Sequence, residues 1–262
     1  SVNTSSSQTL NAGDNINGGA GNDTLNITSA SALAAGTGVT ATGFETVSIT
    51  ATTGAFSLDT TTMSGITAIT NSGSTGADVT VSGLTAKVGV NLTGANANTT
   101  ITHSSSAVAG TADALALTLN GANTTTSGTL TVNGFETINV NAAGATGSST
   151  TSLTIVDDSL QTLAITGSGA SAIVATLSGA NGTTVGTVTG GDGAETLSIT
   201  PGASALMSIS TGAGNDRVNL TSIAATHTIA GGDGTDTLST SVAVSATTGA
   251  NISGFETVRI SA

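Results

Sequence analysis

Apolar and polar residues alternate along most of the chain in short runs. Glycine, asparagine, serine and threonine separate each run from the next. Because alternation with a period of two is typical of half-buried strands, the pattern predicts many short β-strands and almost no helix. Residues 29–36 (SASALAAG) break the alternation, and we expect one helical turn or a loop there. The clearest runs predict strands over residues 46–51, 114–120, 129–133, 137–142, 152–156 and 162–166.

One short strand sequence recurs along the chain. GFETVSI at 43–49 returns as GFETINV at 134–140 and as GFETVRI at 254–260. Looser copies begin with an acidic residue and threonine, as in DTLNI (23–27) and ETLSI (195–199). Reuse of one strand is typical of stacked turns rather than of a single closed core. The sequence therefore predicts an all-β fold, a parallel β-solenoid (β-helix or β-roll) of short stacked strands.

Glycine-rich turns that carry an acidic residue precede several of these strands. GGAGNDTLN (18–26) and GGDGTDTLS (231–239) match the calcium-binding nonapeptide G-G-x-G-x-D-x-U-x, in which U is a large apolar residue. GGDGAETLS (190–198) has glutamate in place of the aspartate, and TGAGNDRVN (211–219) lacks only the first glycine. An apolar residue also lies nine positions before the apolar residue of each turn, at Ile16, Val188, Ile209 and Ile229.

The spacing of the acidic residues predicts a metal site. Glu195, Asp216 and Asp236 follow one another at about twenty residues, so three successive coils should stack their glycine-rich corners along one edge. Calcium takes six to eight oxygen ligands, and glycine lets the backbone aim carbonyl oxygens at one point. We therefore expect Ca²⁺ between neighbouring turns, with folding dependent on the ion. The candidate ligands are Asp14, Gly19, Gly21, Asp23, Gly191, Asp192, Gly193, Glu195, Gly212, Gly214, Asp216, Gly232, Asp233, Gly234 and Asp236.

The alternative is that these are plain glycine turns in a chain with 36 glycines. Glu195 marks the weakest candidate site, because its longer side chain either binds the ion less well or only decorates a turn. Glu45, Glu136 and Glu256 of the GFET segments stand where the nonapeptide has aspartate. One interpretation is that they bind cations. We favour the other, in which they point outward or accept a hydrogen bond from a backbone turn, while Phe44, Phe135 and Phe255 pack at coil ends.

Two further acidic residues and the two histidines are candidates for catalysis or metal binding. Asp157 and Asp158 are adjacent, and adjacent strand residues face opposite sides, so they should not share a proton as a catalytic pair does. We interpret the pair as a turn or a minor cation site. His103 and His227 lie far apart without metal-ligand spacing, and His227 takes the aspartate position of a half-turn, which predicts a structural role.

Composition and charge narrow the possible functions. The 262 residues carry 15 acidic and three basic side chains, for a net charge of −12. Nucleic-acid binding needs clustered Lys and Arg, and no apolar run approaches a membrane span, so we expect neither a nucleic-acid partner nor membrane insertion. A polysaccharide lyase would need basic residues and aromatic platforms, but the chain has no Trp and no Tyr. With no recognisable nucleophile motif either, we expect that the protein is not an enzyme.

The glycine-aspartate turns and the GFET segments resemble those of RTX-type calcium-binding proteins, in particular the RTX-type surface-layer (S-layer) proteins of Gram-negative bacteria. The resemblance implies a calcium-stabilised β-solenoid, secretion by a type I apparatus, and self-association into a two-dimensional lattice on the cell surface. It also implies contact with cell-surface polysaccharide, through regions that are not recognisable here. The alternative function is a calcium-binding stalk or repeat domain of a secreted RTX adhesin.

The organisation along the chain follows from the positions of these motifs. Residues 1–73 hold an RTX-like turn with a GFET strand series, and residues 74–180 form a Thr/Ser/Ala-rich middle. Residues 181–262 hold the C-terminal calcium-binding coils with the last GFET segment. We expect one continuous solenoid. No basic and apolar leader opens the chain, so we expect no signal peptide within it. Because the pattern runs to both ends, we also expect a fragment of a longer protein.

Overall fold

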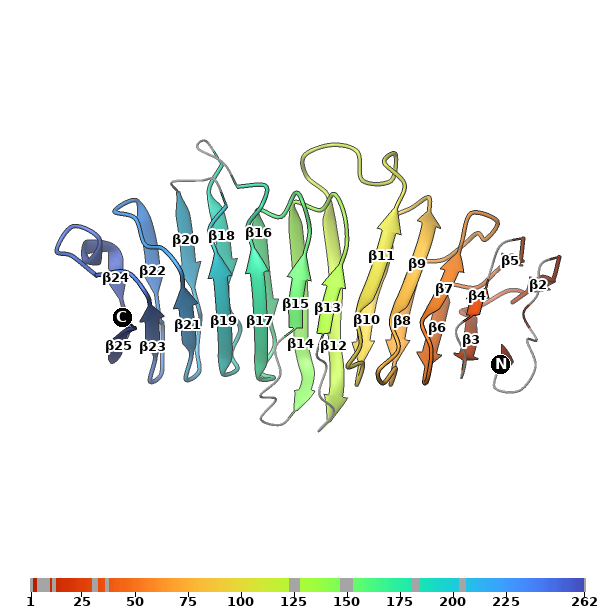
Figure 1. Cartoon of the computed structure of the whole chain (residues 1–262), viewed down its shortest axis with the longest axis horizontal. Coiled ribbons are helices and arrows are strands. Elements are labelled where there is room, and N and C mark those ends of the chain that lie inside the picture. The colour runs from red at the N-terminus through yellow and green to blue at the C-terminus, as the bar shows by residue number, and fades with distance from the viewer. Residues whose placement is uncertain are drawn as a thin grey trace.

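The chain winds into about ten stacked coils, and most coils contribute one short strand to each of two long parallel sheets (Figure 1). The computed structural model describes residues 2–3, 10, 13–29, 33–35, 38–122, 128–146, 153–180, 184–202 and 206–261. Every strand pair in these ranges is parallel and joins strands of adjacent coils. The predicted all-β parallel solenoid is therefore confirmed.

The first sheet has 12 strands, whose order in space is also their order along the chain. They are β1 (Val2–Asn3), β3 (Thr24–Ser29), β6 (Thr46–Ala51), β8 (Ala68–Ser72), β10 (Gly89–Thr93), β12 (Ala114–Ala122), β14 (Thr137–Thr146), β16 (Thr162–Thr166), β18 (Gly186–Thr189), β20 (Met207–Ser210), β22 (His227–Ala230) and β24 (Ile252–Ser253).

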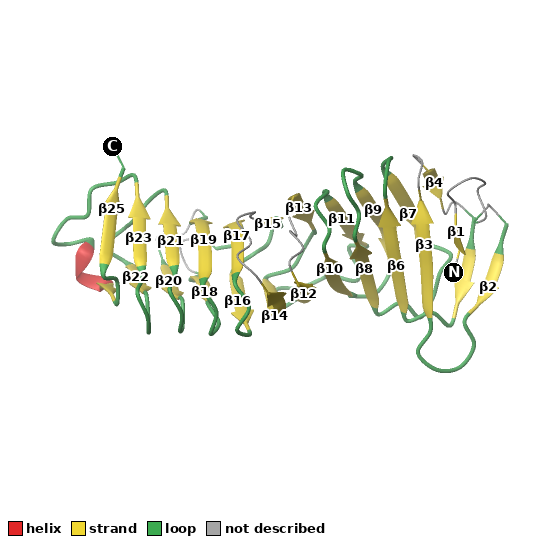
Figure 2. Cartoon of the chain, turned by 90° about the horizontal axis from the view of Figure 1, so that it is seen from below, coloured by secondary structure: helices red, strands yellow, loops and turns green. Residues whose placement is uncertain are grey.

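The second sheet has 11 strands and faces the first across the core (Figure 2). They are β4 (Leu33–Ala35), β7 (Phe56–Asp59), β9 (Val79–Leu84), β11 (Thr99–His103), β13 (Gly128–Thr131), β15 (Leu153–Val156), β17 (Ser171–Thr176), β19 (Glu195–Thr200), β21 (Arg217–Leu220), β23 (Thr237–Thr240) and β25 (Thr257–Ile260). A two-stranded sheet, β2 (Asn15–Asn17) with β5 (Thr40–Thr42), and one 3-10 turn, η1 (Gly249–Asn251), complete the described elements.

The alternating pattern explains the two-sheet arrangement. In β6 and β16 alternate residues are buried, as period-two alternation predicts, and β6 spans the predicted range 46–51. Inward positions stack in register from coil to coil, so Leu197 lies on Val218 and Val218 lies on Leu238. The core is thus one continuous column of buried Leu, Ile, Val and Phe side chains between the sheets. Residues from all three predicted ranges, 1–73, 74–180 and 181–262, contribute strands to the same two sheets.

One local prediction is wrong where the structure describes the segment. Residues 29–36 were expected to be a helical turn or a loop, but Ser29 ends β3, and Leu33–Ala35 forms β4 and pairs with β7. Residues 30–32 and 36 lie outside the described residues. Its pattern LAA shows no alternation, yet pairing with Phe56–Leu58 of the next coil makes it a strand. Tertiary pairing therefore overrides the local sequence signal here.

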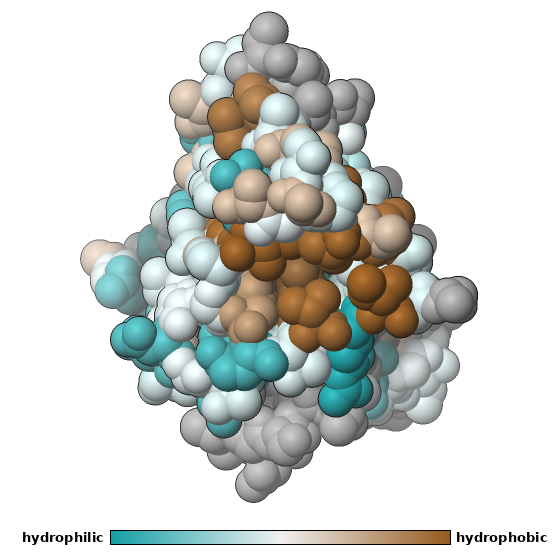
Figure 3. Space-filling view, turned by 90° about the vertical axis from the view of Figure 1, so that its left-hand side faces the viewer, coloured by the Kyte–Doolittle hydropathy of each residue, from teal (hydrophilic) through white to brown (hydrophobic). Residues whose placement is uncertain are grey.

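The C-terminal end of the solenoid exposes apolar positions that other coils bury. Val258 stacks on Leu238 in register, but Val258 is 48% exposed and Leu238 is 0% exposed. Apolar side chains accordingly gather on this end face (Figure 3). The two chain ends lie at opposite ends of the elongated molecule (Figure 1).

Candidate metal centre

The C-terminal glycine-rich turns stack directly on one another. Thr196 pairs with Arg217, Arg217 pairs with Thr237, and Thr237 pairs with Thr257. The residues just before these positions therefore form one column along the edge where the chain passes from the first sheet into the second. We call this column, made of Glu195, Asp216, Asp236 and Glu256, the carboxylate column.

Hydrogen bonds join each member of the column to the next. The backbone N–H of Glu195 donates to Asp216 Oδ1, and that of Asp216 donates to Asp236 Oδ1, both at 2.7 Å. The backbone N–H of Asp236 donates to Glu256 Oε2 at 2.7 Å. Glu195, at the start of the column, instead accepts the Gly191 N–H of its own turn at 3.2 Å. One oxygen of each later carboxylate thus joins adjacent coils, and charge on the acceptor strengthens such bonds.

The remaining carboxylate oxygens are buried without a partner. Glu195, Asp216 and Asp236 are 1%, 2% and 0% exposed. Within the described residues, Glu195 Oε1, Asp216 Oδ2 and Asp236 Oδ2 accept no hydrogen bond. The hydroxyl of Thr211, which lies close enough to Asp216 to lower the pKa of that carboxyl, donates to the Gly231 carbonyl. Buried carboxylate oxygens normally pair with a hydrogen-bond donor or a cation. The unpartnered oxygens of this column could therefore bind a cation.

The burial also changes the protonation of the column. Burial, with a smaller contribution from the charge of Asp216, raises the pKa of Glu195 to about 8. Burial likewise raises the pKa of Asp216 above its usual value. In the absence of a cation Glu195 and Asp216 therefore hold protons more readily than they would in water, because negative charges away from water are unfavourable.

The same hydrogen-bond geometry recurs on the opposite edge of the solenoid. The Asp23 N–H donates to Glu45 Oε2, and the Asp113 N–H donates to Glu136 Oε2, both at 2.8 Å. Strands β3, β6, β12 and β14, which follow these turns, belong to the first sheet, whereas β19, β21, β23 and β25 belong to the second. The predicted stacking of Glu195, Asp216 and Asp236 on one edge is present, and Asp23 lies on the other edge.

Lys87 occupies one of these opposite-edge positions. Its Nζ contacts Asp113 Oδ1 at 2.7 Å, and Asp113 is 5% exposed. This is the one ion pair among the described residues. The coils holding Glu195, Asp216 and Asp236 have no such cationic side chain beside their carboxylates within the described ranges.

The close stacking of the C-terminal turns leaves no room for a Cβ atom and is by itself enough to require glycine there. A Cβ atom on Gly232 would lie 1.9 Å from the Gly212 carbonyl oxygen, and one on Gly234 would lie 1.6 Å from the Gly214 carbonyl oxygen. The Gly212 carbonyl accepts the Asp233 N–H at 2.9 Å, so one of its lone pairs is used along the stack. In the N-terminal turn, a Cβ on Gly21 would meet nothing within 4 Å.

The other predicted ligands do not form a cluster with the carboxylate column. Asp192 and Asp233 are exposed on the outside of their turns, where their N–H groups bond to the carbonyls of Gly167 and Gly212. Asp14 is half-buried just before β2, and its carbonyl accepts the Thr40 N–H at 2.8 Å. No three side chains of Asp, Glu or His converge on one point within the described part of the chain. An ion at the column would therefore take part of its oxygen shell from the backbone or from water.

The GFET glutamates both accept backbone hydrogen bonds and extend the columns of acidic residues, and only the first of these roles was predicted from the sequence. Glu45, Glu136 and Glu256 accept backbone hydrogen bonds, as one of the two alternatives proposed, and they continue the same columns as the aspartates. Asp113 was missed entirely, although DALAL (113–117) has the acid-x-apolar pattern of the other strand starts.

The remaining candidates have structural roles. Asp157 is buried at a turn, where it accepts N–H bonds from Phe135 at 3.1 Å and Ser159 at 2.7 Å, and Asp158 is exposed. Burial raises the pKa of Asp157 to about 6. His227 begins β22, and its Nδ1 accepts the Ala224 N–H at 3.2 Å. The predicted structural role of His227 agrees with this contact.

Comparison with known proteins identifies no family for this chain. A scan against protein-family models, a search of curated proteins and a search of solved structures each found no match. In the part of the chain that the structure describes, no helix has the length and apolar character needed to cross a membrane.

Proposed function

We propose that this chain is a calcium-stabilised structural solenoid that builds an extracellular bacterial surface layer. The observation that carries the calcium part is the carboxylate column, with its buried oxygens that lack a partner. The surface-layer part rests on the resemblance of the glycine-aspartate turns and GFET segments to RTX-type surface-layer proteins. Type I secretion and a location at the cell surface belong to the same proposal.

A comparison between the buried carboxylate of Asp113, which contacts Lys87, and those of the column supports a bound cation at the column. Where Lys87 is present, its ammonium group contacts the buried carboxylate of Asp113 at 2.7 Å. Glu195, Asp216 and Asp236 have equivalent burial and no such neighbour among the described residues. A divalent cation drawn from solution would supply the missing positive charge to the column.

The donor set favours calcium among the common cations. The available ligands are carboxylate and carbonyl oxygens, which suit hard cations such as Ca²⁺ and Mg²⁺. Calcium accepts an irregular shell of mixed oxygens, whereas magnesium requires near-octahedral geometry and retains its waters. Glu195, Asp216 and Asp236 would hold the ion, which would neutralise their charge and bind adjacent coils together.

A secreted adhesin stalk is the second candidate. The long molecule with its ends at opposite poles would suit a stalk as well as a coat (Figure 1). Electron microscopy of the protein in millimolar calcium distinguishes the two. Extended sheets support the coat, and isolated rods favour the stalk.

Calcium removal is expected to lower the melting temperature of the protein. A ligand that binds only the folded state at 100 times its Kd adds about 2.7 kcal/mol of stability per site. We therefore expect a higher circular-dichroism melting temperature in millimolar calcium than in EGTA, and little effect of magnesium at the same concentration. An identical melting curve in calcium and in EGTA would refute the calcium proposal.

Asp236→Asn is expected to destabilise the protein in calcium but not in its absence. In calcium the variant loses a charged ligand and about 1–3 kcal/mol of stability. In EGTA the amide oxygen of the new side chain still accepts the Asp216 N–H, and one buried charge is gone, so the variant is as stable as the wild type or more so. Melting curves of both proteins in both buffers provide the measurement.

The matched control is Asp78→Asn. Asp78 is exposed and its Oδ1 accepts the Asn98 N–H at 3.1 Å, so this variant loses the same charge without touching the column. It should melt like the wild type in both buffers. If Asp236→Asn is equally destabilised with and without calcium, the carboxylate acts through its hydrogen bond alone.

A further inference from the structure

A groove of about 560 Å³ opens at the second sheet, across strands β19, β21, β23 and β25. It lies along the strands that follow the turns of the carboxylate column. Arg217 and Arg259 line it, together with Ser198, Asn219 and Ser239. Its volume lies within the range of roughly 300–1,000 Å³ that is typical of small-ligand sites.

The two arginines project from the same face of the sheet, two coils apart. Val218 and Leu238 are buried, so their neighbours Arg217, Asn219 and Ser239 face outward. Asn219 pairs with Ser239, and Ser239 pairs with Arg259, which places Arg259 on the same face. Adjacent strands lie about 4.8 Å apart and each residue advances about 3.3 Å along a strand. Arg217 aligns with Thr257, two residues before Arg259, so the two arginine backbones lie about 12 Å apart.

Hydrogen bonds hold one side of the groove in place. Arg217 Nε donates to Asn219 Oδ1 at 3.1 Å, and Asn219 Nδ2 donates to Ser198 Oγ at 3.1 Å. This leaves the terminal nitrogens of the Arg217 guanidinium available to a ligand. Ser239 Oγ, between Asn219 and Arg259 in the same row, is buried and has no hydrogen-bond partner among the described residues.

The groove is positively charged in a strongly acidic protein. Two of the three basic residues of a chain with net charge −12 line it. Its described lining includes no carboxylate, and within the described ranges neither arginine forms an ion pair. Unpaired arginines on an acidic protein are poised for an external anion, because guanidinium groups match carboxylates in a two-bond geometry.

We propose that this groove binds an acidic oligosaccharide whose carboxylates lie about 12 Å apart. The arginines take the carboxylates, and the side chains of Ser198 and Asn219 beside Arg217 exchange hydrogen bonds with sugar hydroxyls. The surrounding acidic surface discourages anions elsewhere on the molecule. This site is separate from the carboxylate column and does not depend on the proposed calcium function.

The test uses tetragalacturonate, its fully methyl-esterified form and inorganic phosphate as probes, measured by isothermal titration calorimetry on the folded protein. Tetragalacturonate should bind, and Arg217→Gln and Arg259→Gln should each weaken binding about tenfold, which corresponds to about 1.4 kcal/mol. The double variant should lose measurable binding. The control Lys87→Gln removes the same charge on the opposite edge of the solenoid and should leave the affinity unchanged.

Four outcomes would overturn the proposal. Undetectable binding of tetragalacturonate to the wild type, or equal binding to the wild type and the double variant, removes the site. Equal affinity for the esterified probe means that charge is not recognised, and equal competition by inorganic phosphate means a simple anion site. Circular-dichroism melting of each variant checks that the arginine substitutions leave the solenoid folded.

Discussion

Gly234→Ala is expected to unfold the last coils of the solenoid. The new Cβ would lie 1.6 Å from the Gly214 carbonyl oxygen, and Gly234 has a φ of +139°. Backbone strain there costs about 1–3 kcal/mol, and forcing the two coils apart adds about 1–3 kcal/mol or more. In a repeat fold each coil contacts only its neighbours, so the damage should remain local. Hydrogen exchange measured by mass spectrometry should show lost protection over residues 231–261.

Gly21→Ala is the matched control for Gly234→Ala. Gly21 holds the same position in its nonapeptide, with a φ of +121°, but a Cβ there meets nothing within 4 Å. This variant should therefore lose only the backbone strain of about 1–3 kcal/mol. Equal losses in the two variants would mean that stacking of the turns contributes nothing to the need for glycine.

The strands were predictable because the polarity of each side chain matches the side of the sheet that it faces. Inward residues are apolar and outward residues are polar, so TVSITA coincides with β6 and TLAIT with β16. The signal fails in Leu33–Ala35, where the sequence does not alternate and pairing with the next coil decides the conformation.

The carboxylate column was predictable in part. The repeat spacing indicated that Glu195, Asp216 and Asp236 would stack, because a nearly constant coil length keeps equivalent positions in line. The spacing could not reveal which edge each turn occupies. The middle coils differ in length from the C-terminal ones, with Asp113 and Glu136 separated by 23 residues and Asp216 and Asp236 by 20. A nonapeptide therefore does not fix whether its strand joins the first or the second sheet.

The arginine groove could not be predicted from the sequence. Arg217 and Arg259 are 42 positions apart by their numbers and belong to no shared motif. Only the register of β21, β23 and β25 places them on one face. The net charge of −12 favours cationic partners on average, and the local charge of this groove departs from that average.

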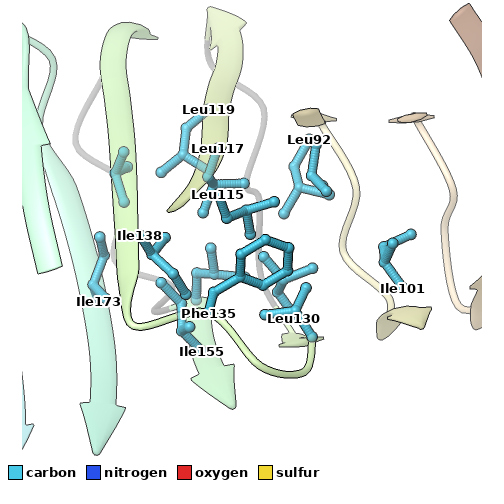
Figure 4. Packing of buried hydrophobic residues seen from close by; sticks show 14 of the residues in the cluster. Leu92, Ile101, Leu115, Leu117, Leu119, Leu130, Phe135, Ile138, Ile155 and Ile173 are labelled. Atoms are coloured by element: carbon cyan, nitrogen blue, oxygen red, sulfur yellow. The ribbon is translucent and has the colours of Figure 1, made fainter. Parts of the chain in front are cut away.

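Phe135→Ala is expected to cost about 3–5 kcal/mol, the usual range for removing a buried phenylalanine. Phe135 is 0% exposed and lies among Leu115, Leu130 and Ile155 in the middle of the solenoid (Figure 4). Its ring also meets His103 edge to face, with centroids 5.0 Å apart. The cavity would weaken the centre of the stack, and a lower thermal melting temperature would report it.

Phe255→Ala is the control, because Phe255 holds the same position in its GFET segment but is only partly buried at the C-terminal end. We expect a loss of about 1 kcal/mol there, since less apolar surface is involved. A similar loss in the two variants would mean that depth in the stack does not matter and that the GFET phenylalanines act locally.

The pKa of His103 offers an independent measure of the same cavity. Burial lowers the pKa of His103 to about 4, so the folded protein holds the imidazole neutral. The stability that this group contributes is present above about pH 6.5 and is lost as the pH falls towards 4.

Water entering the space left by Phe135→Ala should raise the pKa of His103 towards 6.5, which shrinks that acid-dependent loss of stability. A proton NMR titration should show the His103 shift while His227, whose pKa is also lowered by burial, stays unchanged in its distant coil. If neither histidine moves, the core has collapsed around the missing ring, and the melting temperature should then fall by less than an open cavity requires.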